Sequence, residues 1–66
     1  MNYSLNDKEL ESNSNRLAEF LGEQDLLEKG GIAVAINGSV IPKSEWSITE
    51  LNNNDKILII TATQGG

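Results

Sequence analysis

The sequence predicts a two-layer α+β domain, in which one helix packs on one face of a mixed sheet. Three observations lead to this fold class. Two segments, 1–5 and 32–36, alternate in a way that is typical of strands. One stretch between them has apolar residues at helical spacing. A run of four large aliphatic residues, 57–60, is typical of a buried and central strand.

The N-terminal part of the chain predicts a hairpin. Large apolar side chains alternate with polar ones over residues 1–5. Asn6 and Asp7 then form a turn signal, because both residue types tolerate left-handed backbone. Residues 8–12 are expected to form a short edge strand that pairs back on the first, and its charged side chains discourage edge-to-edge association.

A short amphipathic helix is predicted after this hairpin. Ser14 or Asn15 is the expected N-cap, since their side-chain oxygens can accept hydrogen bonds from the first helical N–H groups. The inner stripe consists of Leu17, Phe20 and Leu21. The solvent side consists of Arg16, Glu19 and Glu23. Two to three turns are too short to be stable alone, so the helix needs a sheet to cover.

A second hairpin is predicted from residue 32. Residues 32–36 place large side chains on one face and alanines on the other. Asn37-Gly38 is a strong signal for a tight turn between strands. Val40 and Ile41 begin a short return strand that Pro42 ends, because proline has no N–H to donate to a ladder.

An irregular segment is expected between Pro42 and the last strand. Ile48 and Leu51 are predicted core contacts, and Trp46 is interpreted as a packing residue. The last strand begins at Lys56. With a helix connection in the middle of the chain, the first and last strands are expected to be central and parallel.

Composition excludes several classes of function. The 66 residues allow one domain, and the absence of both histidine and cysteine removes the usual general base and metal ligands. A net charge of −5 argues against nucleic acid as a partner. It is compatible with docking onto a basic protein surface, or simply with solubility. With no apolar span and no leader pattern, we expect a cytoplasmic chain that is not bound to a membrane.

The chain ends in Gln64-Gly65-Gly66 directly after the apolar strand. A globular chain has little reason to run a central strand into a bare Gly-Gly end. This arrangement is typical of a domain that presents its terminal carboxylate to other proteins. The alternative is a frayed end without a role.

These features together resemble the ubiquitin-like β-grasp proteins, and most closely the sulfur-carrier family of bacterial thiamine biosynthesis. The resemblance is carried by Asn6-Asp7, residues 33–38 and 40–43, Glu45-Trp46, Asp55, the aliphatic last strand and Gly65-Gly66. It implies a mixed sheet of four to five strands with one main helix. It also implies a single domain over residues 1–66 with a flexible C-terminal tail at about 62–66.

The resemblance implies a protein co-substrate rather than an enzyme. A ubiquitin-activating-like adenylyltransferase would use ATP and magnesium to join AMP to the carboxylate of Gly66, with Gln64 and Gly65 threading into its active site. A sulfur donor linked to a cysteine desulfurase would form a thiocarboxylate, which thiazole synthase would consume. The carrier itself would be a monomer, with no catalytic residues and no bound metal or cofactor.

The resemblance also assigns a partner surface. It places Ile57 and Ile59 in the core, so the other face of the last strand lies open. The expected partner surface consists of Leu58, Ile60, Ala33 and Ala35. An exposed aliphatic patch on a small domain often marks such a site. The alternatives are that loops or Trp46 cover this face, or that it is ordinary surface.

Three other functions compete with this interpretation. The small subunit of molybdopterin synthase shares the fold, the tail and the chemistry, but that family is usually longer. A ubiquitin-like protein modifier would form covalent adducts on lysines of other proteins. A non-catalytic interaction module would use its surface alone, with no chemistry at Gly66.

Overall fold

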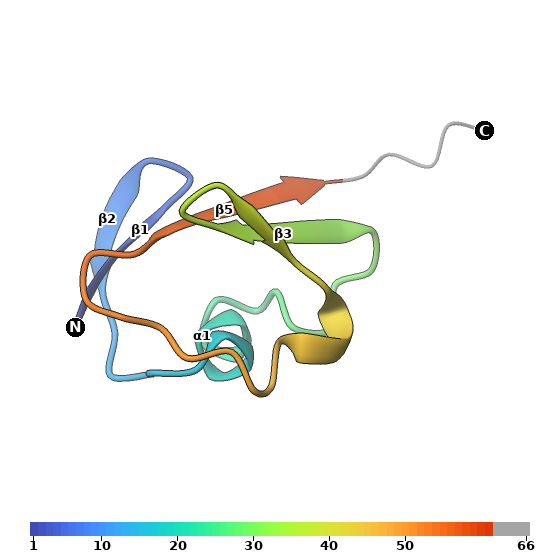
Figure 1. Ribbon diagram of the computed structural model, residues 1–66, viewed down its shortest axis with the longest axis horizontal. Helices are drawn as coiled ribbons and strands as arrows, with labels where there is room; N and C mark the ends of the chain where they lie inside the picture. Colours follow the sequence, from blue (N-terminus) through green and yellow to red (C-terminus); the bar gives the residue numbers. More distant parts are fainter. Residues whose placement is uncertain (62–66) are drawn as a thin grey trace.

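A five-stranded mixed sheet and one helix form the two layers of the molecule (Figure 1). The computed structural model describes residues 1–61. The strands are β1 (Asn2–Leu5), β2 (Lys8–Glu11), β3 (Ile32–Ile36), β4 (Ser39–Ile41) and β5 (Lys56–Thr61). The helices are α1 (Leu17–Glu23) and the single 3₁₀ turn η1 (Lys43–Glu45).

The strand order is β2-β1-β5-β3-β4, which places β5 at the centre of the sheet. β1 and β5 are parallel, while the other neighbouring pairs are antiparallel. The predicted α+β class and the central, parallel placement of the first and last strands are confirmed. The last strand is therefore paired with β1 at its start and with β3 from Ile57 to Thr61.

Both hairpins close through the turns that the sequence predicted. Asn6 and Asp7 have φ angles of 49° and 68°, and Asn37 and Gly38 have 50° and 88°. Positive φ at both central residues is the requirement of a type I′ turn, whose twist matches that of the flanking strands. The turn residues thereby fix the register of β1 against β2 and of β3 against β4.

The start of α1 differs from the prediction. Its N-cap is Arg16, whose side chain makes no capping hydrogen bond, so the prediction of Ser14 or Asn15 is wrong. The first helical N–H groups instead donate to main-chain carbonyls of the segment after η1. These bonds join Leu17 to Thr49 (2.9 Å) and Ala18 to Trp46 (3.0 Å). A tertiary contact supplies the acceptors that a capping side chain would otherwise provide.

The serines that precede α1 bind its last residue instead. Ser12 Oγ and Ser14 Oγ donate to the two carboxylate oxygens of Glu23, at 2.5 and 2.8 Å. The Tyr3 hydroxyl donates to the main-chain oxygen of Ser14 at 2.5 Å. The hydrogen bonds from Ser12 and then Ser14 lower the pKa of Glu23 below its ordinary value. This cluster ties the loop before the helix to the end of the helix.

The Glu23→Gln variant is expected to be less stable than the wild type at neutral pH and to lose this difference in acid. The ionised carboxylate accepts two hydroxyl hydrogen bonds, and its folded-state pKa is depressed. Its contribution is therefore complete above the unfolded-state pKa of about 4.3 and disappears as the pH falls through the folded-state pKa. Thermal unfolding of both chains across this range measures the effect. A difference that does not change with pH would contradict the assignment.

The core lies between α1 and the inner face of the sheet. Its buried hydrophobic members are Tyr3, Leu17, Phe20, Leu21, Val34, Trp46, Leu51 and Ile57. The rings of Tyr3 and Phe20 meet edge to face, with centroids 5.2 Å apart. Burial of the phenol raises the pKa of Tyr3. The predicted inner stripe of the helix, Leu17, Phe20 and Leu21, is thus confirmed.

One of the two predicted core contacts after η1 is wrong. Leu51 is 3% exposed and packs in the core, but Ile48 is 68% exposed. The Ile48 N–H donates to the Glu45 carbonyl at 3.2 Å, so the chain is still turning at this point. The Ile48 side chain therefore faces solvent, while Trp46 and Leu51 of the same segment pack in the core. Sequence hydrophobicity alone could not distinguish these two positions.

Asp55 anchors the start of β5. Its buried carboxylate accepts a hydrogen bond from Asn37 Nδ2 at 3.0 Å and another from the Asn52 N–H at 2.8 Å. Asn37 Oδ1 in turn accepts from the Lys56 N–H at 2.9 Å. The β3–β4 turn and the loop before β5 are thereby joined, which fixes where the central strand begins.

Candidate functional site

The two faces of β5 differ sharply in exposure. Ile57 is 2% exposed and Ile59 is half-buried against the core, as the family resemblance implied. Leu58 and Ile60 alternate with them on the opposite face and are 47% and 45% exposed. Figure 1 shows that α1 covers one face of the sheet. The alternation of side chains along a strand therefore places Leu58 and Ile60 on the uncovered face.

An apolar patch crosses three strands on this uncovered face. Directly paired residues share a face, and Leu58 is paired with Ala35 and Ile60 with Ala33. Ala35 is also paired with Val40 of β4, which is 66% exposed. We call this set the open-face patch: Val40, Ala33, Ala35, Leu58 and Ile60.

The structure brings the four predicted surface residues together on one face and adds Val40 to them. Ala35 is only 5% exposed, so it offers a partner little surface of its own. Trp46 does not cover the patch, since its ring is buried in the core and its Nε1 donates to the Ile41 carbonyl at 2.9 Å. The role of Trp46 as a packing residue is confirmed. The sequence prediction did not include Val40, although its place in the return strand beside Asn37-Gly38 was a usable signal.

A shallow hollow of about 550 Å³ adjoins one end of the open-face patch. Ala35 and Leu58 contribute its apolar surface, and Lys56 lines it as well. The turn residues Asn6 and Asn37 stand on either side of β5 there. A hollow with an apolar base between polar turns fits one apolar side chain of a partner protein.

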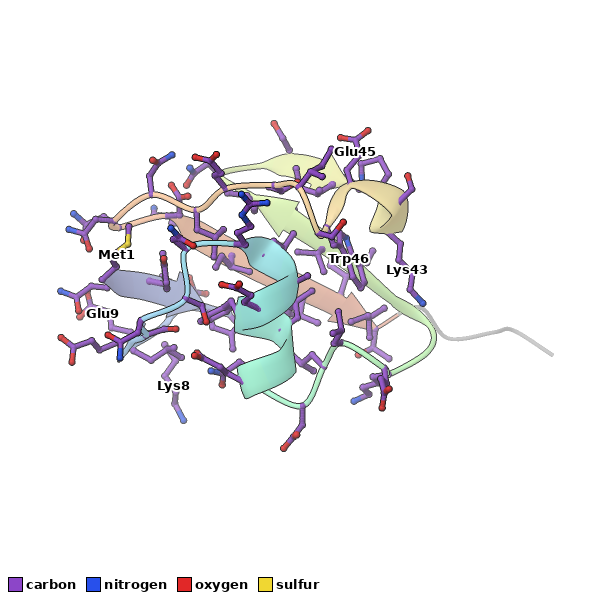
Figure 2. The ribbon with its side chains drawn as sticks, turned by 90° about the horizontal axis from the view of Figure 1, so that it is seen from below. Met1, Lys8, Glu9, Lys43, Glu45 and Trp46 are labelled. Atoms are coloured by element: carbon purple, nitrogen blue, oxygen red, sulfur yellow. The ribbon has the colours of Figure 1, made fainter. Side chains whose placement is uncertain are left out.

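Acidic side chains border the same face on its far edge. Ser4 is paired with both Lys56 and Glu9, so Glu9 of β2 lies on the face of the open-face patch. Glu11 follows two residues later on the same side of β2. Figure 2 places Glu9, with Lys8 and Met1, at the opposite end of the molecule from Lys43 and Trp46. An apolar centre with an acidic border suits a partner surface that is apolar and basic.

Lys43 projects from η1 toward the Trp46 ring, with its ammonium nitrogen 5.9 Å from the ring centroid (Figure 2). This distance allows a weak cation–π contact. The described residues, 1–61, contain no group of three or more acidic side chains arranged to hold a metal ion. In that same part of the chain, no helix has the length and apolarity needed to cross a bilayer.

The three predicted tail residues, Gln64, Gly65 and Gly66, lie outside the described residues, as does the predicted tail at 62–66. What the structure does place is the end of β5 at Thr61. The strand that leads to the tail is therefore central in the sheet and fixed at its start by Asp55.

Comparisons with known proteins agree with this architecture. The model of the ThiS family matches residues 3–66. A crystal structure of a thiamine biosynthesis protein (ThiS) from Geobacter metallireducens superposes with a TM-score of 0.86 at 20% identity, covering 100% of both chains. An NMR solution structure of a thiamine biosynthesis protein from that organism gives a TM-score of 0.75 at 20% identity, covering 100% of this chain and 88% of the other.

At this level of identity the two structures establish the fold, which is the β-grasp arrangement that the sequence predicted. Comparison with the sequences of curated proteins gives no significant match.

Proposed function

The chain belongs to the ThiS family, and from this premise we propose that it is a sulfur carrier for thiamine biosynthesis. The observation that carries the proposal is that the family match extends from residue 3 to Gly66 and so includes the Gly-Gly end. The absence of histidine and cysteine from the sequence also supports a chain that is acted on by other proteins.

The proposed chemistry takes place at the carboxylate of Gly66. An α-carboxylate has a pKa of about 3.3–3.7, so it is an anion at neutral pH and a poor electrophile. A cytoplasmic adenylyltransferase joins AMP to this carboxylate and releases pyrophosphate from ATP, with magnesium as its own cofactor. The persulfide of a desulfurase-linked donor then displaces AMP to form an acyl disulfide, and a thiol cleaves its S–S bond, which leaves the thiocarboxylate and a disulfide on the donor side. Thiazole synthase takes the sulfur and returns the carboxylate.

The glycines have a steric role in this chemistry. Without a Cβ atom, Gly65 and Gly66 allow the backbone to pass a narrow channel and to approach a phosphate group closely. A side chain at Gly66 would crowd the carbonyl carbon that AMP and sulfur must both reach. Gln64 has a full side chain, so the channel has to be wider where this residue lies.

The open-face patch is the proposed docking surface for the adenylyltransferase. Leu58 and Ile60 are half-exposed aliphatic side chains on the strand that leads to the tail, so docking there orients the tail as well. The acidic border at Glu9 and Glu11 favours a partner with basic residues beside its apolar contact. Association is therefore expected to weaken as salt concentration rises.

Intact-mass analysis of the chain purified from its native host tests the proposal. We expect a fraction of the protein to gain the mass difference between one sulfur and one oxygen at its C-terminus. Adducts on lysines of other proteins would instead identify a protein modifier. Complementation of a thiamine auxotroph then separates the thiamine pathway from molybdopterin synthesis. Neither a thiocarboxylate nor complementation in a host that supplies all partners would reject the proposal.

A further inference from the structure

The two edges of β5 are paired to different extents. β3 pairs with β5 at five successive positions, from Ile57 to Thr61. β1 pairs with β5 at two positions, Lys56 and Ile57. Figure 1 shows that β5 continues past the β1–β2 turn with β3 beside it. Among residues 1–61, no strand pairs with β5 on the β1 side beyond Ile57.

The side chain of Asn6 marks the point where this pairing stops. The Asn6 N–H donates to the Ile57 carbonyl at 3.0 Å, and Asn6 Oδ1 accepts from the Ile59 N–H at 2.8 Å. At Asn6 and Asp7 the backbone turns away with positive φ angles, which ends β1. The tight turn that forms the β1–β2 hairpin therefore leaves the rest of this edge of β5 without a strand.

The backbone groups that face this edge follow from the alternation of a strand. The Ile57 carbonyl and the Ile59 N–H both point to the β1 side. Groups two residues apart along a strand point the same way, so the Ile59 carbonyl and the Thr61 N–H face this side too. We call this segment the free edge of β5: Ile59 to Thr61, on the side away from β3.

The free edge lacks the protection that the outer strands have. Residues 57–61 include no charge and no proline, whereas the outer strand β2 carries Lys8, Glu9 and Glu11, and Pro42 follows the outer strand β4. Charged side chains and proline are the usual means of preventing strand addition at an edge. A backbone with alternating free acceptor and donor is complementary to one kind of occupant, an extended peptide.

We propose that an extended segment of the adenylating partner pairs with the free edge of β5 and adds a strand to the sheet. The inference rests on the proposed function, because it assigns this edge to the protein that loads Gly66. Strand addition buries the Ile59 carbonyl and the Thr61 N–H in hydrogen bonds immediately before the tail. It extends the contact made by Leu58 and Ile60, which alternate with Ile59 and Thr61 along β5.

N-methylation of the Thr61 amide tests the proposal, since a chain of 66 residues is accessible to chemical synthesis. The methyl group removes a donor that no strand of the described sheet uses and blocks the approach of a new strand. We expect the Kd for the adenylyltransferase to rise about tenfold, the effect of one hydrogen bond, with an unchanged melting temperature. Thr61→Val is the matched control, because it changes the side chain, keeps the N–H and should bind as the wild type does.

Amide hydrogen exchange provides a second measurement. We expect the Thr61 amide of the wild-type chain to exchange more slowly when the adenylyltransferase is bound. An N-methylated chain that binds as tightly as the wild type, or a Thr61 amide that the partner leaves unprotected, would overturn the inference. So would protection that increases with carrier concentration in the absence of partner, which would identify a second copy as the occupant. If the partner fails to adenylate even the unmodified chain, it is the proposed function that fails.

Discussion

Deletion of Gly66 is expected to abolish ATP–pyrophosphate exchange by the adenylyltransferase, and Gly66→Ala to slow it about 100-fold. The deletion moves the carboxylate back by one residue, so that it no longer reaches the α-phosphate of ATP. The alanine variant keeps the length but adds a Cβ beside the reacting carbon. A misplacement of about 1 Å at a reacting centre is enough to produce a loss of this size.

The body of the domain provides the control for these two variants. Both should dock with a Kd close to that of the wild type, because the open-face patch and the free edge of β5 are unaltered. The loss is then expected in the turnover of exchange rather than in the concentration of carrier that half-saturates it. Exchange at the wild-type rate by the chain that lacks Gly66 would contradict the assignment of that residue.

Local sequence patterns predicted the strands and their turns, because the residues that determine each of these structures lie within a few positions of one another. Asn37-Gly38 and Asn6-Asp7 occupy left-handed backbone, which few other residue types accept, so these turns could be located from the sequence. The large-and-small alternation of residues 32–36 likewise follows from the two faces of one strand. In both cases local preference and the final fold agree.

The errors arose where tertiary contacts override local preference. Ser14 has the chemistry of an N-cap, but its hydroxyl binds Glu23 at the other end of the helix. The N–H groups at the start of the helix donate to the Thr49 and Trp46 carbonyls, and no local sequence pattern predicts such a contact. Ile48 is as hydrophobic as Leu51, and only the path of the main chain decides which one is buried.

The distinction between local patterns and tertiary contacts also applies to the candidate site. Alternation along β5 was enough to place Leu58 and Ile60 on one face and Ile57 and Ile59 on the other, and the family resemblance then assigned the second pair to the core. The free edge of β5 has no such signal. It depends on where β1 and β3 end against β5, and that difference becomes visible only when the register of both pairs is known.

Aspartate is expected to have different effects at two neighbouring positions of β5. At Ile57 it should destabilise the fold, and at Leu58 it should weaken binding of the partner. Ile57 is 2% exposed, and an unpaired carboxylate there costs more than about 4 kcal/mol. A domain of this length has a total stability of about 3–10 kcal/mol at 0.05–0.15 kcal/mol per residue. The Ile57→Asp variant should therefore lose a large part of this stability, which thermal unfolding followed by circular dichroism will measure.

The Leu58→Asp variant should fold, because that side chain is 47% exposed and its carboxylate stays in water. It places a charge in the middle of the open-face patch, and we expect the Kd for the adenylyltransferase to rise at least about 30-fold, the effect of losing one hot-spot residue. The two substitutions lie one position apart, each replaces one aliphatic side chain by aspartate, and net charge is matched, so the variants differ mainly in which face of β5 carries the new charge. An unfolded Leu58→Asp variant, or a folded one that binds normally, would show that this face is not the docking surface.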